Sequence, residues 1–250
     1  MATDHAIGID IGGTGIKGAV IDLGTGELVT DRVKVRTPDG GRPADILAAT
    51  EELVAGIDER TGTKLPLGVC FPAVVKDGRT LSAANISEEW IGLPAEEMFE
   101  KALGRDIHFI NDADAAGYAE SRYGAAAGAD GLVILTTLGT GIGSALIYDG
   151  VLVPNSELGH LELDGHDAES RAAYSAMERE SLSWEKWAKR LQRYYAHLEF
   201  IFSPDLFVVG GGVSKHHEHF LPLLKLRAPI VPAVHRNNAG ILGAAALAIR

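Results

Sequence analysis

The chain is poor in cysteine, in basic residues and in long apolar runs, and each shortage excludes a class of protein. Cys70 is the only cysteine among 250 residues, so a disulfide framework and a cysteine-based zinc site are both excluded. No apolar run approaches the roughly 18 residues of a membrane span. The polar start, Met1–His5, lacks the apolar core of a signal peptide. We therefore expect a cytoplasmic protein without a membrane partner.

Basic residues are outnumbered by acidic ones. The sequence has 23 lysines and arginines against 34 aspartates and glutamates, which gives a formal net charge of −11. Sequence-independent binding of nucleic acid needs a basic face, so nucleic acid is excluded as a partner. Any polyanionic substrate would need a local basic patch that acts against this unfavourable overall field.

Glycine is abundant, with 30 residues, and the most informative stretch is Asp10-Ile-Gly-Gly-Thr-Gly-Ile-Lys-Gly18. Apolar residues on both sides predict a strand, a tight turn and a second strand. Glycines let the backbone bend sharply and approach a ligand, and successive N–H groups in such a turn form a concave anion site. Asp10 is placed to face a metal ion, and Lys17 can reach the same anion. The stretch therefore predicts a phosphate site with a divalent cation.

Two commoner phosphate motifs do not fit this stretch. Gly13, Gly15 and Gly18 have the spacing of the dinucleotide fingerprint, but that fingerprint needs a helix next, and the residues after Gly18 continue as a strand. The Walker spacing is absent. The remaining alternative is a glycine-rich hairpin that binds nothing, and the flanking aspartate and lysine weigh against it.

A second copy of the turn occurs in the other half of the chain. Residues 139–142 repeat the sequence Gly-Thr-Gly-Ile of residues 13–16, at an offset of 139 − 13 = 126 residues, and apolar runs flank both copies. Chance repetition in a glycine-rich chain is the alternative. The matching flanks favour a duplicated α/β domain with a ligand cleft between the copies.

Hydrophobic periodicity predicts further strands and helices in both halves. The predicted strands beyond the two hairpins are residues 27–35, 65–71, 107–110 and 206–209. The predicted helices are residues 43–57, from 94 onward, 112–123, from 214 onward, 184–201 and 241–249. A stripe of tryptophan and tyrosine on the helix at 184–201 is typical of a core or a subunit contact.

Asn111-Asp112 lies where a predicted strand ends and a helix begins. Ligands of open α/β sheets bind at this end of the strands, and a carboxylate there can accept the proton of a substrate hydroxyl. An equally good interpretation is that Asp112 only caps the helix. Asp114 is better explained as a first-turn acid favoured by the helix dipole.

The polar run at 155–162 follows the second hairpin, and Glu157 and His160 lie three residues apart with a glycine between them. Such a pair can converge on the hydroxyls of a sugar. A metal site with His160, His166 and Asp167 is one alternative, although no helical His-Glu-x-x-His spacing supports it. A polar surface without function is another.

Two further stretches give weaker signals. The run at 216–219, His-His-Glu-His, has the composition of a metal-binding tract, but a solvated helix start explains it better. The glycines at 210–212 lie between a strand and a helix, where the backbone could approach a phosphate or an adenine.

Together these pieces resemble the actin/hexokinase-like sugar kinases and, among them, the ROK family (repressors, open reading frames, kinases). The resemblance covers nearly the whole chain. Residues 10–17 are similar to the family's first phosphate motif, 138–143 to its second, 209–214 to its adenosine-side motif and 111–114 to its catalytic run. It implies a duplicated, ribonuclease H-like, two-domain α/β fold with a cleft between the lobes.

The resemblance also implies roles for single residues. Asp112 would be the general base. Asp10 would hold Mg²⁺, through water. The sugar hydroxyls would be bound by Asn85, Asn111, Asp112, Glu157, His160 and Glu169. The phosphates or the nucleotide would be bound by Gly12, Gly13, Thr14, Gly15, Lys17, Thr137, Gly139, Thr140, Gly141, Gly211 and Gly212.

Two departures from the family pattern are informative. Most ROK kinases carry a cysteine-rich zinc motif after the run that ends here at His160, but residues 160–169 contain no cysteine. We therefore predict no structural zinc, and the role of Glu169 depends on the conformation of that loop. The short chain and this loop are similar to the polyphosphate glucokinases of actinobacteria, in which inorganic polyphosphate, often with ATP as a second donor, supplies the phosphoryl group. Ala73 replaces a glycine that relatives often have after Pro72.

The resemblance implies a phosphotransferase that acts on the 6-hydroxyl of glucose, with mannose as an open alternative. The expected lobes are residues 1–112 plus 237–250 and residues 113–236, and a homodimer is expected. The basic residues considered for an extended polyphosphate are Lys17, Lys76, Arg79, Arg122, Lys215 and Arg236.

Three other functions stay open from the sequence. An ATP-only ROK hexokinase would use the same residues. A non-catalytic, sugar-sensing ROK protein would be expected to carry an N-terminal helix-turn-helix, for which few residues precede the first strand. An actin-like ATPase would use the same phosphate turns, but the asparagine, glutamate and histidine set speaks against it.

Overall fold

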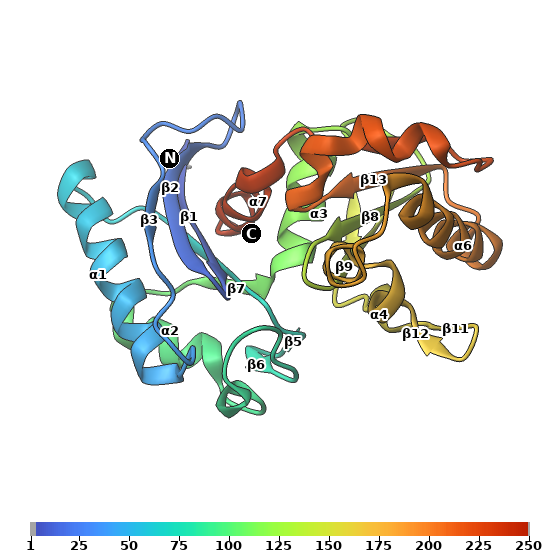
Figure 1. Ribbon diagram of the computed structural model, residues 1–250. Helices are drawn as coiled ribbons and strands as arrows, with labels where there is room; N and C mark the ends of the chain where they lie inside the picture. The colour runs from blue at the N-terminus through green and yellow to red at the C-terminus, as the bar shows by residue number, and fades with distance from the viewer. Residues whose placement is uncertain (1–3, 250) are drawn as a thin grey trace. The chain divides into compact units, whose positions relative to one another are not determined.

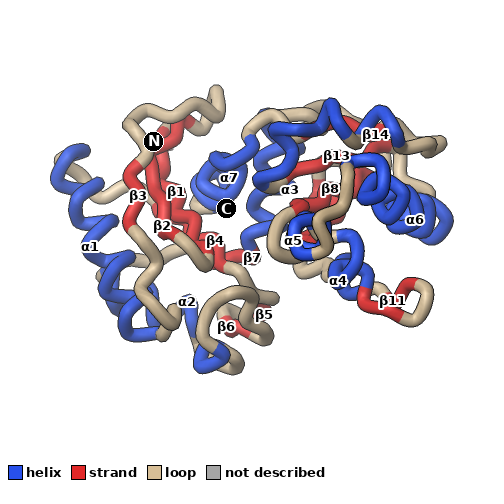
Figure 2. The backbone as a smooth tube through the Cα atoms, viewed as in Figure 1, coloured by secondary structure: helices blue, strands red, loops and turns tan. Residues whose placement is uncertain are grey.

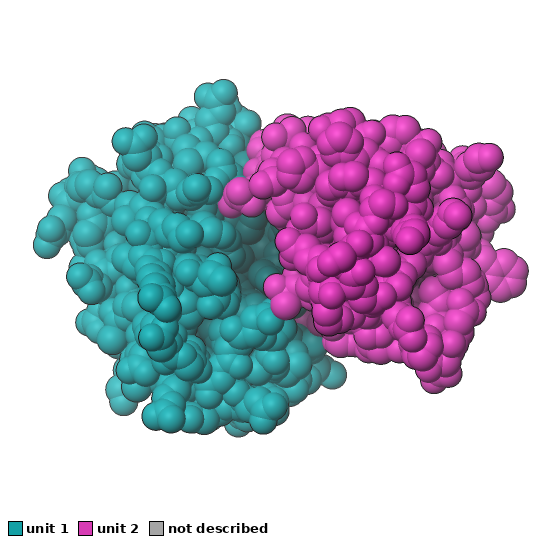
Figure 3. Space-filling view, viewed as in Figure 1, with its two compact units in different colours: residues 1–119, 238–250 teal, residues 120–237 magenta. Residues whose placement is uncertain are grey.

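The computed structural model describes residues 4–249, and the chain divides into two compact units. Unit 1 contains residues 1–119 and 238–250, and unit 2 contains residues 120–237 (Figure 3). Helix α3 (Asp112–Tyr123) begins in unit 1 and ends in unit 2. The lobes expected from the sequence have their limits at 112 and 236.

Unit 1 is built on a five-stranded sheet in the order β3-β2-β1-β4-β7 (Figure 1). The first three strands pair antiparallel, and β1, β4 and β7 pair parallel. The bounds are β1 His5–Gly12, β2 Gly15–Asp22, β3 Val33–Val35, β4 Leu67–Phe71 and β7 His108–Asn111.

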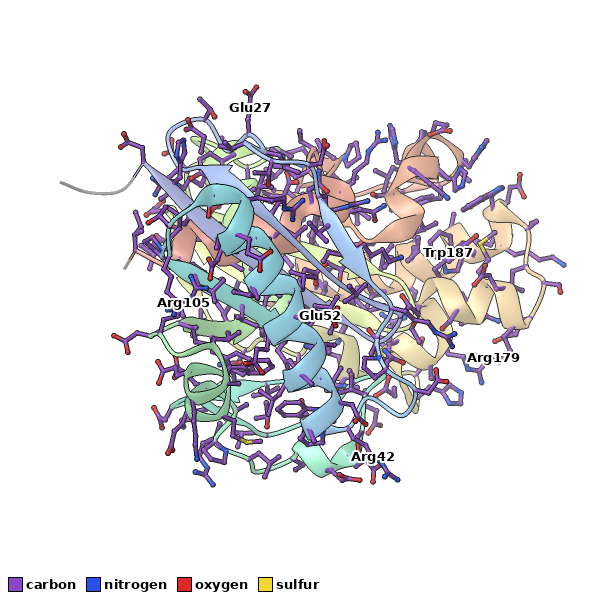
Figure 4. All side chains as sticks on the ribbon, turned by 90° about the vertical axis from the view of Figure 1, so that its left-hand side faces the viewer. Glu27, Arg42, Glu52, Arg105, Arg179 and Trp187 are labelled. Carbon is purple, nitrogen blue, oxygen red and sulfur yellow. The ribbon has the colours of Figure 1, made fainter. Side chains whose placement is uncertain are left out.

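Helices cover both faces of this sheet. α1 (Pro43–Thr61) buries Ile46, Leu53 and Ile57 against one face, and Glu52 lies on its exposed side (Figure 4). α7 (Ala239–Leu247) lies on the other face, so close that a Cβ atom added at Gly8 would be 1.9 Å from the carbonyl oxygen of Ile241. The sheet therefore lies between α1 and α7, as Figure 1 shows.

The rest of unit 1 connects these elements. α2 (Ala95–Leu103) supplies Phe99, which stacks on Trp90 with ring centroids 5.8 Å apart in the apolar core. The short elements are β5 Val75–Lys76, β6 Arg79–Thr80 and the 3₁₀ turn η1 Glu88–Trp90.

Unit 2 repeats the topology of unit 1. Its sheet has the order β10-β9-β8-β13-β14, with β8, β9 and β10 antiparallel and β8, β13 and β14 parallel. Figure 2 colours the strands red and labels β8, β13 and β14 of this sheet. The bounds are β8 Leu132–Leu138, β9 Ile142–Tyr148, β10 Val151–Val153, β13 Leu206–Gly210 and β14 Ile230–Pro232. Two sheets with one strand order and one set of directions confirm the duplicated α/β fold that the repeated glycine turn predicted.

The remaining elements of unit 2 surround this sheet. α6 (Trp184–Phe202) buries Trp187, Leu191, Tyr194 and Leu198 in the core, and Trp187 is labelled in Figure 4. The aromatic stripe is thus core. The shorter elements are β11 Glu162–Leu163, β12 His166–Asp167, α4 Ala168–Ala172, α5 Tyr174–Arg179 and the 3₁₀ turns η2 Leu158–His160, η3 Gly212–His219, η4 Leu221–Leu223 and η5 Arg236–Asn238.

Two predictions about local structure were wrong. The strand expected at 27–35 is only Val33–Val35, with one isolated bridge from Leu28 to Ile21. The backbone N–H of Val20 donates to the hydroxyl of Thr30 rather than to a main-chain carbonyl, which interrupts the ladder. The helix expected from Ser214 is a 3₁₀ segment that starts earlier, at Gly212.

Among residues 4–249, every helix is too short or too polar to cross a bilayer.

Candidate functional site

The first glycine turn joins β1 to β2 and ends the hairpin at the pair Gly12–Gly15, leaving Gly13 and Thr14 as an exposed two-residue loop. A Cβ atom at Gly13 would lie 2.6 Å from the carbonyl oxygen of Asn85. Asn85 itself has a left-handed backbone, with φ of 61°. The turn and Asn85, which the sequence assigned to phosphate and to sugar, therefore touch each other within unit 1.

Asp10 and Lys17 are directly opposite each other in this hairpin. The Nζ of Lys17 lies 2.8 Å from Oδ2 of Asp10, and both side chains are largely buried, with 24% and 16% exposed. The other oxygen, Oδ1, accepts a weak hydrogen bond from Cys70 Sγ at 3.7 Å. Gly240, in the first turn of α7, leaves room for this carboxylate, since a Cβ there would be 3.2 Å from Asp10 Cγ.

Asn111 fixes the start of α3. Its Nδ2 donates to the carbonyl of Ala73 at 3.0 Å, and its Oδ1 accepts from the N–H groups of Ala113 and Asp114. The helix cap is thus supplied mainly by Asn111. Asp112 accepts from Ala113 through Oδ1 at 2.8 Å and stays partly exposed.

The charges of Asp10 and Asp112 both affect the pKa of one buried thiol, that of Cys70. Burial raises the pKa of Cys70 well above its usual value, and the charges of Asp10 and then Asp112 raise it further. Cys70 lies opposite Asp10 in the register of β1 and β4. The predicted metal carboxylate and the predicted base therefore lie on either side of the same residue of β4.

The second glycine turn joins β8 to β9 and differs in length. The last pair is Leu138–Ile142, so Gly139, Thr140 and Gly141 form a three-residue loop. Ser175 on α5 holds this loop: its N–H donates to the Gly139 carbonyl at 3.0 Å, and its hydroxyl donates to the Thr140 carbonyl at 2.6 Å. No sequence pattern indicated this role for Ser175, which lies 35 residues after Thr140 in the chain.

The third glycine run lies beside the second turn. Gly210 pairs with Thr137 in the register of β13 and β8, and Gly211, with φ of 80°, approaches Leu138 so closely that a Cβ would be 2.4 Å from its carbonyl oxygen. The predicted phosphate residues of unit 2, including Gly212 at the start of η3, therefore gather at the carboxyl ends of two parallel strands.

Glu157, His160 and Glu169 are also brought together. Partial burial raises the pKa of Glu157, with His160 opposing and Glu169 adding to that shift. Glu169 Oε2 accepts the N–H of Ile142 at 2.8 Å, directly after the second glycine turn. The loop without cysteines thus still places Glu169 beside the other two residues.

Asp167 is a residue that the sequence assigned only to a possible metal site. Its Oδ2 lies 2.9 Å from His160 Nδ1, and its Oδ1 accepts from the N–H groups of Glu169 and Ser170 at the start of α4. The hydrogen bond to Asp167 raises the pKa of His160, with the charge of Glu169 acting in the same direction and partial burial opposing. Asp167 therefore fixes both the imidazole and the helix that carries Glu169.

Two groups of side chains in residues 4–249 have potential ligand atoms within 4.8 Å of one another: His160 with Asp167 and Glu169, and His216 with Glu218 and His219. Neither group includes a cysteine. The absence of a structural zinc stays a prediction.

Known proteins are similar to this chain over most of its length. A family model described as "ROK family" matches residues 6–174. The chain is 47% identical over 242 residues to a polyphosphate glucokinase of Mycobacterium tuberculosis (strain CDC 1551 / Oshkosh), covering 96% of this chain and 90% of that protein.

Two solved structures are also similar. The inorganic polyphosphate/ATP-glucomannokinase of Arthrobacter sp. strain KM is 52% identical, with a TM-score of 0.94 over 99% of this chain and 98% of that one. A ROK family glucokinase of Streptomyces griseus in complex with glucose and AMPPNP is 26% identical, with a TM-score of 0.82 over 97% and 98% of the two chains.

Proposed function

The chain belongs to the ROK family, and from this premise we propose that it transfers a phosphoryl group from inorganic polyphosphate, and from ATP, to the 6-hydroxyl of glucose. The observation that carries the proposal is 52% identity over nearly the full length of both chains to a polyphosphate/ATP-glucomannokinase, together with 47% identity to a polyphosphate glucokinase. The name of the Arthrobacter enzyme makes mannose the second sugar to test.

In this proposal Asp112 accepts the proton of the attacking sugar hydroxyl. Its place at the carboxyl end of β7, held by the capping bonds of Asn111, supports the role. A base in phosphoryl transfer only orients and deprotonates the nucleophile, because most of the catalysis is positioning and charge stabilisation. The start of α3 supplies positioning of this kind.

The donor phosphates are assigned to the two glycine turns, and Gly211 and Gly212 are assigned to the same donor. The first turn contributes exposed backbone at Gly13 and Thr14, and the second contributes the loop that Ser175 holds in place. Backbone N–H groups in glycine turns stabilise anions without a charged side chain, which suits a protein of net charge −11.

Mg²⁺ is the expected cofactor. Asp10 supplies carboxylate oxygens, the donor type that this ion prefers, but Lys17 already lies 2.8 Å from Oδ2. The residues present therefore fit an ion held through water rather than by direct contact. When bound, it would neutralise charge on the phosphates.

The residues that we assign to the sugar are Asn85, Asn111, Glu157, His160 and Glu169. Several directional partners are needed to bind a polyhydroxyl compound, and these residues offer both donors and acceptors.

We further propose that the protein acts in the cytoplasm and that it forms a homodimer. Light scattering of the purified chain tests the homodimer directly.

A coupled assay for glucose 6-phosphate, with polyphosphate or ATP as donor and glucose or mannose as acceptor, tests the function. We expect product with polyphosphate and glucose, and loss of activity on removal of Mg²⁺ by a chelator. Product with ATP but none with polyphosphate would instead support an ATP-only ROK hexokinase. Sugar binding without product from either donor would leave the sugar-sensing alternative.

A further inference from the structure

The edge strand of unit 1 carries a regular alternation of basic and apolar residues. Residues 32–36 read Arg-Val-Lys-Val-Arg, and strand β3 occupies the central three (Figure 1). Val33 and Val35 are partly buried against the core of unit 1, whereas Lys34 and the two flanking arginines are exposed. Because side chains alternate between the faces of a strand, Lys34 lies on the face opposite the valines, and Arg32 and Arg36 flank the two ends of the strand.

This basic face is the one that carries the first phosphate site. Lys34 pairs directly with Lys17 in the register of β2 and β3, so both lie on one face of the sheet together with Asp10. Lys34 also lies along the glycine turn: a Cβ atom at Gly15 would be 2.6 Å from Lys34 Cε and 3.5 Å from its Nζ. The lysine ammonium is therefore beside the backbone that binds phosphate in the proposed function.

The two lysines differ in how their charges are balanced. Lys17 is paired with Asp10 at 2.8 Å, whereas Lys34 makes no ion pair among residues 4–249. Like charges directly opposite each other in a sheet are destabilising. A bound anion beside Gly15 would remove that cost.

The arginines extend the basic face in both directions. Arg32 Nη1 donates to Asn238 Oδ1 at 2.9 Å, just before α7. Arg36 lines a cavity of about 390 Å³ together with Gly13 and Thr14. Its pairing with Asp39, at 2.9 Å, joins two side chains that are more than 80% exposed, and such pairs are weak. Arg36 can therefore exchange this partner for a phosphate.

We propose that Arg32, Lys34 and Arg36, here named the basic edge, bind the chain of inorganic polyphosphate as it leaves the first glycine turn. The proposal rests on the proposed function and adds to it residues that distinguish a long polyanion from ATP. A triphosphate is bound mainly at the turns, whereas a long chain continues over the edge strand and gains one charge contact for each basic residue. Charged side chains on an edge strand also prevent the strand from pairing with other chains. The test must therefore separate binding of polyphosphate from this protection against aggregation.

The test compares Lys34→Met and the double variant Lys34→Met/Arg36→Met with wild type in the full-length protein. Lys101→Met, which removes an exposed lysine from α2, is the matched control. We expect the KM for long-chain polyphosphate to rise about 5- to 10-fold in Lys34→Met, because a charge-assisted contact is lost. The KM values for ATP and tripolyphosphate should change less than about 2-fold. The dependence of polyphosphate KM on salt should lose about one unit of log–log slope for each charge removed.

Direct binding of long-chain polyphosphate, measured by calorimetry without sugar, separates this inference from the proposed function. If wild type forms no sugar phosphate with any donor, the function fails, while the binding comparison still decides whether the basic edge holds polyphosphate. Equal effects on polyphosphate and ATP, or none beyond the Lys101→Met control, would overturn the inference. Displacement of polyphosphate by single-stranded RNA at equal charge concentration would also overturn it, because it would indicate unspecific adhesion of polyanions. Lys34→Glu, at the same exposed position, should weaken polyphosphate binding further than Lys34→Met.

Discussion

The Nζ of Lys17 lies 2.8 Å from Oδ2 of Asp10, and the two residues face each other across the first glycine hairpin. Each side chain is mostly buried, so each depends on the other for its counter-charge. In the proposed reaction both stand where donor phosphates and their counter-ion meet. In that proposal the pair would link the stability of the hairpin to donor binding.

Replacing Lys17 by methionine separates these two roles. We expect the free energy of unfolding to fall by about 1–3 kcal/mol, because a buried carboxylate loses its partner. The value of kcat/KM should fall at least about 10-fold with both donors, because a cation beside the phosphates is lost. Chemical unfolding and steady-state kinetics measure the two effects. Lys17→Arg, which keeps the charge, is the control, and undiminished kcat/KM in Lys17→Met would rule out a role in donor binding.

Asp112→Asn tests the proposed base. The amide oxygen can still accept from Ala113, so the start of α3 should persist. Turnover should fall by at least about 10²-fold, because general base catalysis is lost. Glucose affinity, measured by calorimetry, should change little. Turnover equal to that of wild type would remove the assignment and leave Asp112 as a helix-start residue.

Asp167→Asn tests the cause of the raised pKa of His160. The folded-state pKa lies above the reference value of 6.5, mainly because of the hydrogen bond to Asp167. A group of this kind contributes stability that is fully present below pH 6.5 and is lost as the pH rises through the folded-state pKa. In Asp167→Asn the pKa of His160 should fall, and that pH-dependent contribution should shrink. NMR titration of the imidazole measures the shift, and His166→Gln, which leaves the pair intact, should not cause it.

Glu169 supports the second glycine turn and is assigned to the sugar, and two substitutions distinguish the roles. Glu169→Gln keeps an oxygen that can accept the N–H of Ile142, whereas Glu169→Ala removes it. We expect both to weaken glucose binding. Only the alanine variant should also raise the KM for the donor and lower stability, by about 1 kcal/mol. Donor KM values that rise equally in the two variants would argue that charge, rather than support of the turn, is what matters.

Glycine-to-alanine changes at Gly8 and Gly56 should have opposite effects on stability, because only Gly8 is packed closely against α7. A Cβ at Gly8 would lie 1.9 Å from the Ile241 carbonyl oxygen, whereas a Cβ at Gly56 in α1 meets nothing within 4 Å. Gly8→Ala should destabilise the fold by at least about 2 kcal/mol through forced displacement of α7. Gly56→Ala should stabilise it by about 0.5–1 kcal/mol, because alanine is the better helix former. Thermal unfolding of both variants measures the contrast.

Local patterns in the sequence were sufficient to predict the elements that depend on neighbours in the chain. Apolar runs around Gly13 and Gly139 predicted both hairpins, and helical spacing predicted α1 and α6. The repeated turn predicted the duplication that the matching strand orders confirm. The strand at 27–35 failed because the hydroxyl of Thr30 bonds the backbone of Val20, a competition that no strand propensity records.

The sequence alone determined that this is a duplicated α/β protein with two similar glycine turns and a carboxylate at a helix start, because glycine spacing and hydrophobic period are local properties. Only the tertiary structure decided that Asp167 holds His160, that Glu169 supports the second turn and that Lys34 lies beside the first. Those relationships depend on strand register and on contacts between residues distant in the chain, and neither is written in the spacing of the residues themselves.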